Sequence, residues 1–309
     1  MVRTKRGERI AVSHLTKTFG RVRAVDDLTF TVEPGGIAGF LGPNGAGNTT
    51  TLRALLGLIH ADAGSATFDG RPYRALRSPN NDVGAVLDAG TFHPARSGRN
   101  HLRVYCTVNG YPMRRADEVL DMVGLAHAAR RAVHGYSLGM RQRLALATAL
   151  LGDPGVLVLD EPANGLDPHG IAWLRDVLRE LAERGRTILV SSHVLAELQQ
   201  FVDHFVIVNE GRLVRQGTLE EIADAQGRAV VVRTPQLDEL LAAVRQRGGH
   251  ADPTGPDSAR VRRMTVDEVG QLAHREGIEL RWLALEPVNL EEIFLALTEQ
   301  PTGVPQEVR

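Results

Sequence analysis

The chain has 309 residues, of which 43% are hydrophobic and 24% charged, and its formal net charge is −1. These values are typical of a soluble globular protein with one large domain, or with a main domain and a smaller one. The balanced charge argues against a protein that binds nucleic acid through bulk positive charge. Cys106 is the only cysteine, so no intramolecular disulfide can form. No apolar run has the length of a signal peptide or a membrane span, so any membrane role requires another chain.

The first two thirds of the chain predict strands that alternate with helices. Strands rich in Val, Leu, Phe and Thr are predicted at 10–15, 24–32 and 37–41, and a leucine-rich helix at 49–59. A further strand at 82–87 precedes a mostly helical region at about 96–151. Then follow a buried-type strand at 157–159, a helix at 171–183, strands at 187–191 and 205–208, and a turn at Glu210-Gly211. This order predicts an α/β domain whose mainly parallel sheet is covered on both faces.

Beyond about residue 227 the pattern starts again. Strands are predicted at 229–233, 261–264 and 280–285, helices at 237–247, 266–276 and 290–297, and a Gly/Pro/Asp-rich loop at 248–257. We therefore expect a main domain at 8–225, a small α+β appendage at 228–300 and a frayed tail at 301–309.

The first motif follows the strand at 37–41 and opens the helix at 49–59. It reads Gly42-Pro43-Asn44-Gly45-Ala46-Gly47-Asn48-Thr49-Thr50. Gly42, Gly47 and Thr49 have the spacing of a phosphate-binding P-loop, but Asn48 occupies the lysine position. Glycines let backbone N–H groups face phosphate oxygens, and the helix N-terminus attracts the same anion. Taken alone, the segment could also be a glycine-rich turn without a ligand.

Two further motifs carry side chains suited to nucleotide chemistry. An apolar strand ends in Asp160-Glu161, which places two carboxylates at the edge of the sheet where α/β folds bind ligands. One could hold Mg²⁺ and the other could orient or deprotonate water; alone, this could be a strand with an acidic turn. Tyr136-Ser137-Leu138-Gly139-Met140 opens a helix, where Ser137 could be a simple cap or part of an anion site.

Taken in order, these segments resemble the ABC-type ATPases over about residues 8 to 225. The resemblance also includes Gly165-Leu166-Asp167 and Ser192-His193. The residues of the 136–140 signature are similar to those of the branch that exports drugs, antibiotics or peptides. So is the segment Asn-Leu-Glu-Glu-Ile-Phe at 289–294. The resemblance implies a P-loop NTPase-type fold with an antiparallel N-terminal β part and a helical subdomain at about 96–151.

The resemblance also implies a role for each matching position. Phe19 would stack on the adenine, and Gly42 to Thr50 would wrap the phosphates of ATP. Thr49 and Asp160, with Asp88, would hold Mg²⁺. Glu161 would be the general base and His193 would contact the γ-phosphate. In a second copy of the cassette, the bound nucleotide would face Ser137, Gly139 and Met140, with Asp167 at the dimer seam.

Four positions, in three segments, depart from the family pattern. Asp88 replaces a glutamine and is expected to contribute to the contact with the membrane subunit, while Leu138 and Met140 replace the commoner Gly and Gln of the signature. Asn48 is the serious departure, because losing a charge-assisted contact costs about 2–4 kcal/mol in the transition state, or roughly two to three decades in rate.

The leading hypothesis is the ATP-hydrolysing subunit of a transporter. It would dimerise, lie at the cytoplasmic face of the membrane and drive export through a separate permease. One alternative is a regulatory subunit that binds but does not hydrolyse nucleotide because of Asn48. The other is an ABC-type ATPase acting on DNA or ribosomes. Those proteins usually carry two cassettes or a long coiled-coil insertion, for which this chain has no room, so no nucleic-acid partner is expected.

Overall fold

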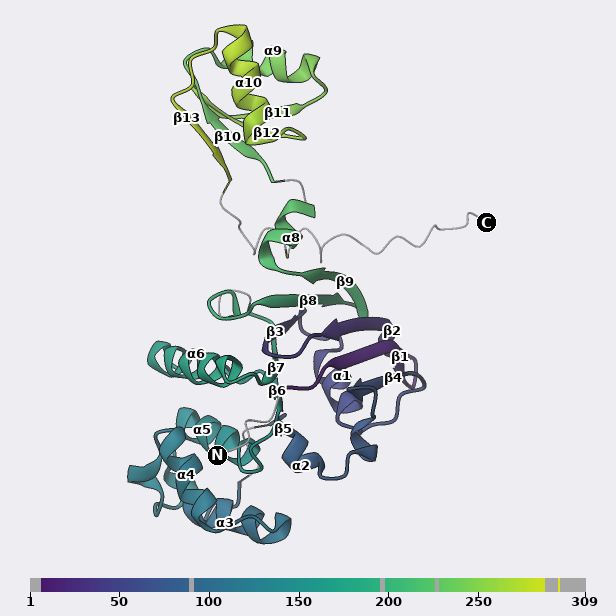
Figure 1. The fold of residues 1–309 in the computed structure, drawn as a ribbon, viewed down its shortest axis with the longest axis vertical. Coiled ribbons are helices and arrows are strands. Elements are labelled where there is room, and N and C mark those ends of the chain that lie inside the picture. Colours follow the sequence, from purple (N-terminus) through teal and green to yellow (C-terminus); the bar gives the residue numbers. More distant parts are fainter. Residues whose placement is uncertain (1–6, 89–91, 195–197, 226–227, 287–293, 295–309) are drawn as a thin grey trace. The chain divides into compact units, whose positions relative to one another are not determined.

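The computed structural model describes residues 7–88, 92–194, 198–225, 228–286 and 294 (Figure 1). The chain divides into two compact units, one containing the residues up to Gln216 and the other spanning Gly217–Ala296. Among the described helices, none has the length and apolar character needed to cross a membrane.

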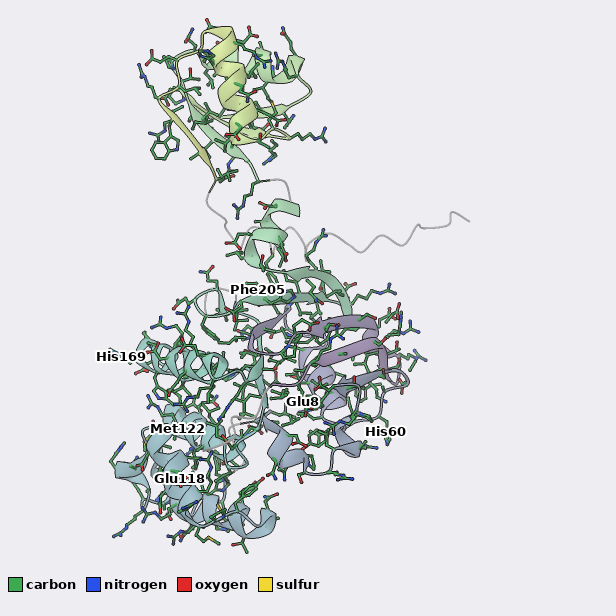
Figure 2. The ribbon with its side chains drawn as sticks, in the orientation of Figure 1. Glu8, His60, Glu118, Met122, His169 and Phe205 are labelled. Carbon is green, nitrogen blue, oxygen red and sulfur yellow. The ribbon has the colours of Figure 1, made fainter. Side chains whose placement is uncertain are left out.

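The first unit is built on a six-stranded sheet. Its strand order is β5 (Val83–Val86), β6 (Val156–Asp160), β7 (Thr187–Ser192), β3 (Gly36–Leu41), β8 (His204–Asn209) and β9 (Arg212–Gly217). The pairs β5–β6, β6–β7, β7–β3 and β3–β8 are parallel. Their side chains are mostly buried, as in Phe205 of β8 (Figure 2), which explains their continuous apolar runs. The predicted α/β class and the mainly parallel sheet are confirmed.

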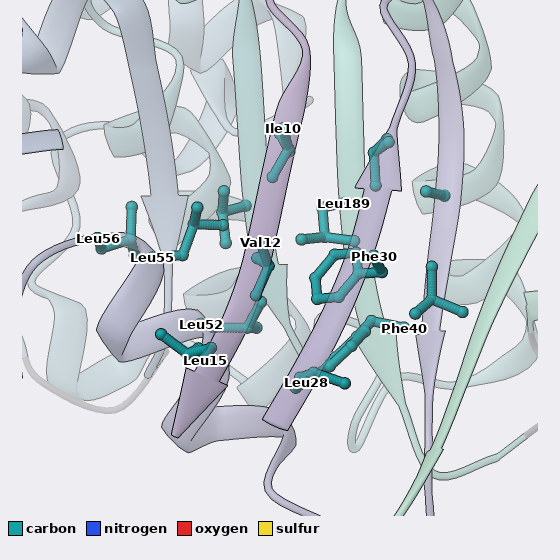
Figure 3. Packing of buried hydrophobic residues seen from close by; sticks show 14 of the residues in the cluster. Ile10, Val12, Leu15, Leu28, Phe30, Phe40, Leu52, Leu55, Leu56 and Leu189 are labelled. Atoms are coloured by element: carbon teal, nitrogen blue, oxygen red, sulfur yellow. The ribbon is translucent and has the colours of Figure 1, made fainter. Parts of the chain in front are cut away.

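A three-stranded antiparallel sheet packs against the first one. Its order is β2 (Val22–Val32), β1 (Ile10–Phe19) and β4 (Ala63–Phe68). Apolar side chains of β1 and β2 meet those of β3, β7 and helix α1 (Asn48–Leu55) in one cluster (Figure 3). Phe30 and Phe40 lie at its centre, with ring centroids 5.1 Å apart. This packing fixes the turn between β3 and α1, where the phosphate-loop motif lies.

Helices cover the remaining surfaces of the first unit. Figure 1 shows α1 on the side of β1 and β2, and α6 (Pro168–Glu183) on the opposite side of the six-stranded sheet. The region predicted to be helical contains α3 (Gly98–Asn109), α4 (Arg114–Met122) and α5 (Leu138–Ala149); α2 (Pro79–Asp82) precedes β5. Short 3₁₀ turns lie at Tyr73–Ala75, Ala126–Ala128 and Val133–Gly135. The helix predicted at 49–59 ends at Leu55, because Gly57 takes a left-handed conformation, with φ 64°.

The second unit begins with α8 (Leu219–Ala225). It continues with β10 (Val230–Arg233), α9 (Leu237–Gln246), β11 (His250–Gly255), β12 (Ser258–Arg262), α10 (Val266–Glu276) and β13 (Trp282–Leu285). The strands form one antiparallel sheet in the order β11-β12-β10-β13, which with two helices gives the ferredoxin-like β-α-β-β-α-β arrangement.

Three strands, β4, β9 and β11, were not predicted, and one predicted helix lies largely outside the described residues. The loop expected at 248–257 is instead strand β11, which pairs with β12. Its Pro253 is tolerated because β11 is an edge strand, where a missing N–H need not break the ladder. Strand β4 was missed because its Ala-Gly-Ser sequence has low strand propensity, and pairing with β1 overrides it. Of the helix predicted at 290–297, only Phe294 is described.

Candidate active site

The glycine-rich segment forms a compact turn between β3 and α1. Ala46 N donates to Pro43 O at 3.0 Å, and Gly211 N donates to Ala46 O at 3.0 Å. Gly47 caps α1 with φ 98°, and a Cβ there would lie 2.3 Å from Ala24 O, so only glycine fits. The first turn of α1 carries no acidic residue. The N-terminal N–H groups of α1 are therefore suited to an anion.

Asn48 brings no charge to this turn. Its Nδ2 donates weakly to Gly42 O, at 3.5 Å. Its buried Oδ1 has no hydrogen-bond partner in the described part of the chain. The amide thus folds back onto the loop. The turn keeps the backbone donors of a phosphate site, but it lacks the cation that usually accompanies them.

A hydroxyl and a carboxylate meet beside the loop. Thr49 Oγ1 donates to Asp160 Oδ2 at 2.8 Å, and Ser191 Oγ donates to Asp160 Oδ1 at 2.5 Å. Mg²⁺ in nucleotide sites takes one or two protein oxygens, and phosphates and waters supply the rest. The pair Thr49 and Asp160 fits this donor set. The described residues contain no cluster of three or more His, Cys, Asp or Glu that would hold a metal without such help.

Asp88 lies at the same edge of the sheet. It follows β5, whose Val86 pairs with Leu159 of β6, two residues before Glu161. Its side chain is exposed. The structure thus places Asp88 at the end of the strand beside Asp160, which is compatible with the predicted position near Mg²⁺.

Glu161 and His193 form a hydrogen-bonded pair at the ends of β6 and β7. Glu161 Oε1 lies 2.9 Å from His193 Nδ1, and both side chains are partly exposed. Glu161 has a left-handed backbone with φ 48°. Its N–H donates to both O and Oγ of Ser191, at 3.2 and 3.1 Å. A carboxylate held by a histidine beside an anion site could accept a proton from water.

Phe19 lies at the end of β1 and is 50% exposed. It pairs with Val22 across the β1–β2 hairpin. Ala24, two residues further along β2, is the residue against which Gly47 packs. This end of the hairpin therefore lies beside the phosphate loop, where an exposed aromatic ring could stack on a base.

The remaining predicted residues gather elsewhere in the first unit. Ser137 caps α5, with its Oγ accepting from Met140 N at 3.3 Å, and Asp167 caps α6 by accepting from Gly170 N at 2.7 Å. Both line an open cavity of about 590 Å³, together with Gly124, Leu125, His127, Leu138, Gly139, Met140, Arg143, Gly165, Leu166 and Gly170. The guanidinium of Arg143 lies 4.0 Å from the Trp173 ring centroid. Burial lowers the pKa of Arg143, and the Asp167 carboxylate partly opposes this.

The predicted residues thus form two separate groups. The loop group contains Gly42–Thr50, Asp160, Glu161 and His193, and the signature group contains Ser137, Gly139, Met140 and Asp167. No member of the loop group lines the cavity of the signature group. Ser191, which contacts both Asp160 and Glu161, is a further site residue that sequence reasoning missed.

A glycine-rich loop between a parallel strand and a helix, beside a strand that ends in Asp-Glu, defines the class of P-loop ATPases. Comparison with known proteins narrows the class. Residues 25–164 match the family described as "ABC transporter", and residues 228–291 match a family described as a domain of unknown function.

Two curated relatives cover nearly the whole chain. It is 42% identical to the bacitracin transport ATP-binding protein BcrA of Bacillus licheniformis, over 93% of this chain and 96% of the relative. It is 34% identical to the daunorubicin resistance ATP-binding protein DrrA3 of Streptomyces coeruleorubidus, over 94% of this chain and 95% of the relative. A solved structure of an "ATP binding subunit of ABC transporter" superposes with a TM-score of 0.63 at 27% identity, covering 70% of this chain and 92% of that one.

The chain therefore belongs to the ABC transporter ATP-binding proteins, a family of ABC-type ATPases. The family and the ATPase class predicted from the sequence are confirmed. The alternative of a subunit that does not hydrolyse nucleotide receives no support from these comparisons.

Proposed function

We propose that this chain powers the export of an antibiotic-, drug- or peptide-like substrate through a separate membrane-spanning permease. Support comes from the two relatives named for bacitracin transport and daunorubicin resistance, each of which matches over more than nine tenths of the chain. The chain would work at the inner face of the membrane, held there by the permease.

Val104, Tyr105 and Val108 of α3 are large apolar side chains exposed to solvent, which favours a contact with another protein on this helix.

Within this proposal the loop group binds and hydrolyses ATP. The backbone donors of Gly42–Thr50 hold the phosphates, and Phe19 stacks on the adenine. Thr49 and Asp160, with Asp88, would hold Mg²⁺, which would supply positive charge beside the phosphates. Glu161 accepts the proton of the attacking water, and the hydrogen bond from His193 keeps its carboxylate in place.

The separation of the two groups is the observation that carries the proposed mechanism. Ser137 and Gly139 begin a helix whose N–H groups can bind an anion, yet they line a cavity with no phosphate loop in it. A second copy of the chain would bring its loop group to this cavity, with Asp167 at the seam. ATP would then be bound between two cassettes, and hydrolysis would release them.

The test is ATP-dependent dimerisation of a variant that cannot hydrolyse. In Glu161→Gln the general base is lost while the backbone donors remain. We expect light scattering to show the mass rising from one chain of 33.6 kDa to two when ATP and Mg²⁺ are added. The matched control is Glu161→Gln combined with Ser137→Arg, which fills the signature cavity and should stay monomeric. A single-chain mass for Glu161→Gln at high concentration with saturating ATP would contradict the proposal.

A further inference from the structure

Ser191 connects the two carboxylate residues of the loop group. It lies in β7 directly across from Asp160 of β6, and it is fully buried. Its hydroxyl donates to Asp160 Oδ1 at 2.5 Å and accepts from Glu161 N at 3.1 Å. One hydroxyl therefore makes a hydrogen bond to the side chain of one residue and to the backbone of the next.

The hydrogen bond to Asp160 sets the orientation of its carboxylate. Thr49 Oγ1 donates to Oδ2 and Ser191 Oγ donates to Oδ1, so each oxygen has a donor and the carboxylate plane cannot rotate freely. Hydrogen bonds to a charged group are stronger than those between neutral groups. Without the Ser191 hydroxyl, Oδ1 would lose this donor.

The hydrogen bond from Glu161 supports a strained backbone. Glu161 has φ 48°, a region that costs free energy for a residue with a Cβ. Its N–H donates to both the carbonyl and the hydroxyl of Ser191. These bonds hold Glu161 in the turn that directs its side chain to His193 rather than along the strand.

We propose that Ser191 is a positioning residue for ATP hydrolysis, which couples the orientation of Asp160 to the backbone of Glu161. The inference rests on the roles assigned to Thr49, Asp160 and Glu161 in the proposed function. Ser191 is buried and acts only through these two residues. Its loss should therefore reduce the contribution of Mg²⁺ and the turnover, and leave nucleotide binding by the loop backbone unchanged.

The experiment compares Ser191→Ala with Thr187→Val. Thr187 lies at the other end of β7 and is equally buried. Within the described part of the chain its hydroxyl accepts from Gly35 N at 3.3 Å and contacts neither Asp160 nor Glu161. Affinity for a fluorescent ATP analogue is measured in EDTA and in Mg²⁺, and turnover is measured alongside. For Ser191→Ala we expect unchanged affinity in EDTA, loss of most of the affinity gained with Mg²⁺, and a turnover about tenfold lower or more. Thr187→Val should behave as the wild-type chain in all three measurements.

A second variant guards against a folding defect. Ser191→Cys fills the same space with a weak hydrogen-bonding group, so it should resemble Ser191→Ala. If either folded variant gains as much affinity with Mg²⁺ as the wild-type chain and has the wild-type turnover, the role of Ser191 is overturned and the proposed function stays intact. Absence of any Mg²⁺-dependent binding in the wild-type chain would overturn the proposed function and this inference with it.

Discussion

At the scale of single residues, Asn48 changes the charge of a loop whose other features are intact. Gly47 retains its left-handed conformation, Thr49 contacts Asp160, and the backbone donors remain. Nucleotide binding should therefore be weakened and not abolished. Hydrolysis should suffer more, because charge on the transferring phosphoryl group must be stabilised in the transition state, and a neutral amide cannot do this.

We expect Asn48→Lys to raise turnover by at least about tenfold, with a smaller change in ATP affinity. Steady-state hydrolysis and equilibrium binding measure the two quantities separately. Asn48→Gln is the control, since it lengthens the side chain without adding charge and should leave turnover low. If the wild-type chain already hydrolyses ATP at the rate of Asn48→Lys, a cation must come from elsewhere. Arg143, which lines the signature cavity of a second copy, would be the first candidate.

The residues of the loop group were predictable because their spacing is local. Gly42, Gly47 and Thr49 lie within eight positions, and Asp160 and Glu161 are adjacent at the end of an apolar strand. Ser191 could not be found in this way. Its hydrogen bonds to Asp160 and Glu161 depend on the register between β6 and β7, which joins residues about 30 positions apart. No periodicity within one segment carries that information.

At the scale of elements, α3 carries a histidine whose buried position disfavours its protonation. His101 is 5% exposed, and neither of its ring nitrogens has a hydrogen-bond partner in the described part of the chain. Its ring packs against Phe92 and Tyr105, with centroid distances of 4.9 and 5.0 Å. Burial, with a smaller contribution from the charge of Arg96, lowers the pKa of His101 from 6.5 to about 4.

This shift predicts a loss of stability in mild acid. The folded chain holds His101 neutral, whereas the unfolded chain protonates it below pH 6.5. The stabilisation is therefore complete above pH 6.5 and is lost as the pH falls towards 4. When the pH falls from 7 to 5, this one histidine should lower the free energy of unfolding by about 2 kcal/mol.

Denaturant titrations at pH 7 and pH 5 test this cost. His101→Phe keeps a ring between Phe92 and Tyr105 and cannot take up a proton. Its unfolding free energy should therefore fall by about 2 kcal/mol less than that of the wild-type chain between the two pH values. Equal losses in both chains would show that His101 does not titrate on unfolding.

Elements with strong local signals were predicted with accurate bounds. Helix α10 was predicted at 266–276 and observed there, because Thr265 and Glu268 form a capping box and Gly277 ends the helix. Strands β4 and β11 were missed because small residues and a proline fill them, and only pairing with β1 and β12 makes them strands. Local sequence does not encode a strand whose stability comes mainly from its neighbour.

At the scale of the whole molecule, the residues of the proposed nucleotide site lie in one of the two units. Every residue of the loop group and every residue lining the signature cavity precedes Gln216. The second unit has its own apolar core, in which Val230, Val232 and Val261 of the sheet pack against Leu240 and Leu272 of the helices. It therefore has the internal packing of an independent domain.

A chain that ends at Gly217 should bind ATP within about threefold of the full-length affinity, because it keeps the phosphate loop and its support. This end point keeps Gln216, whose Nε2 donates to Thr31 O at 3.0 Å and whose Oε1 accepts from Thr31 N at 3.3 Å. Affinity for a fluorescent ATP analogue is compared with that of the full chain, and circular dichroism reports folding.

The control is a chain that ends at Glu210. It lacks β9 and the contact of Gly211 N with Ala46 O in the loop, so it should bind more weakly and melt at a lower temperature. Loss of binding in a folded chain ending at Gly217 would mean that the second unit helps to build the nucleotide site.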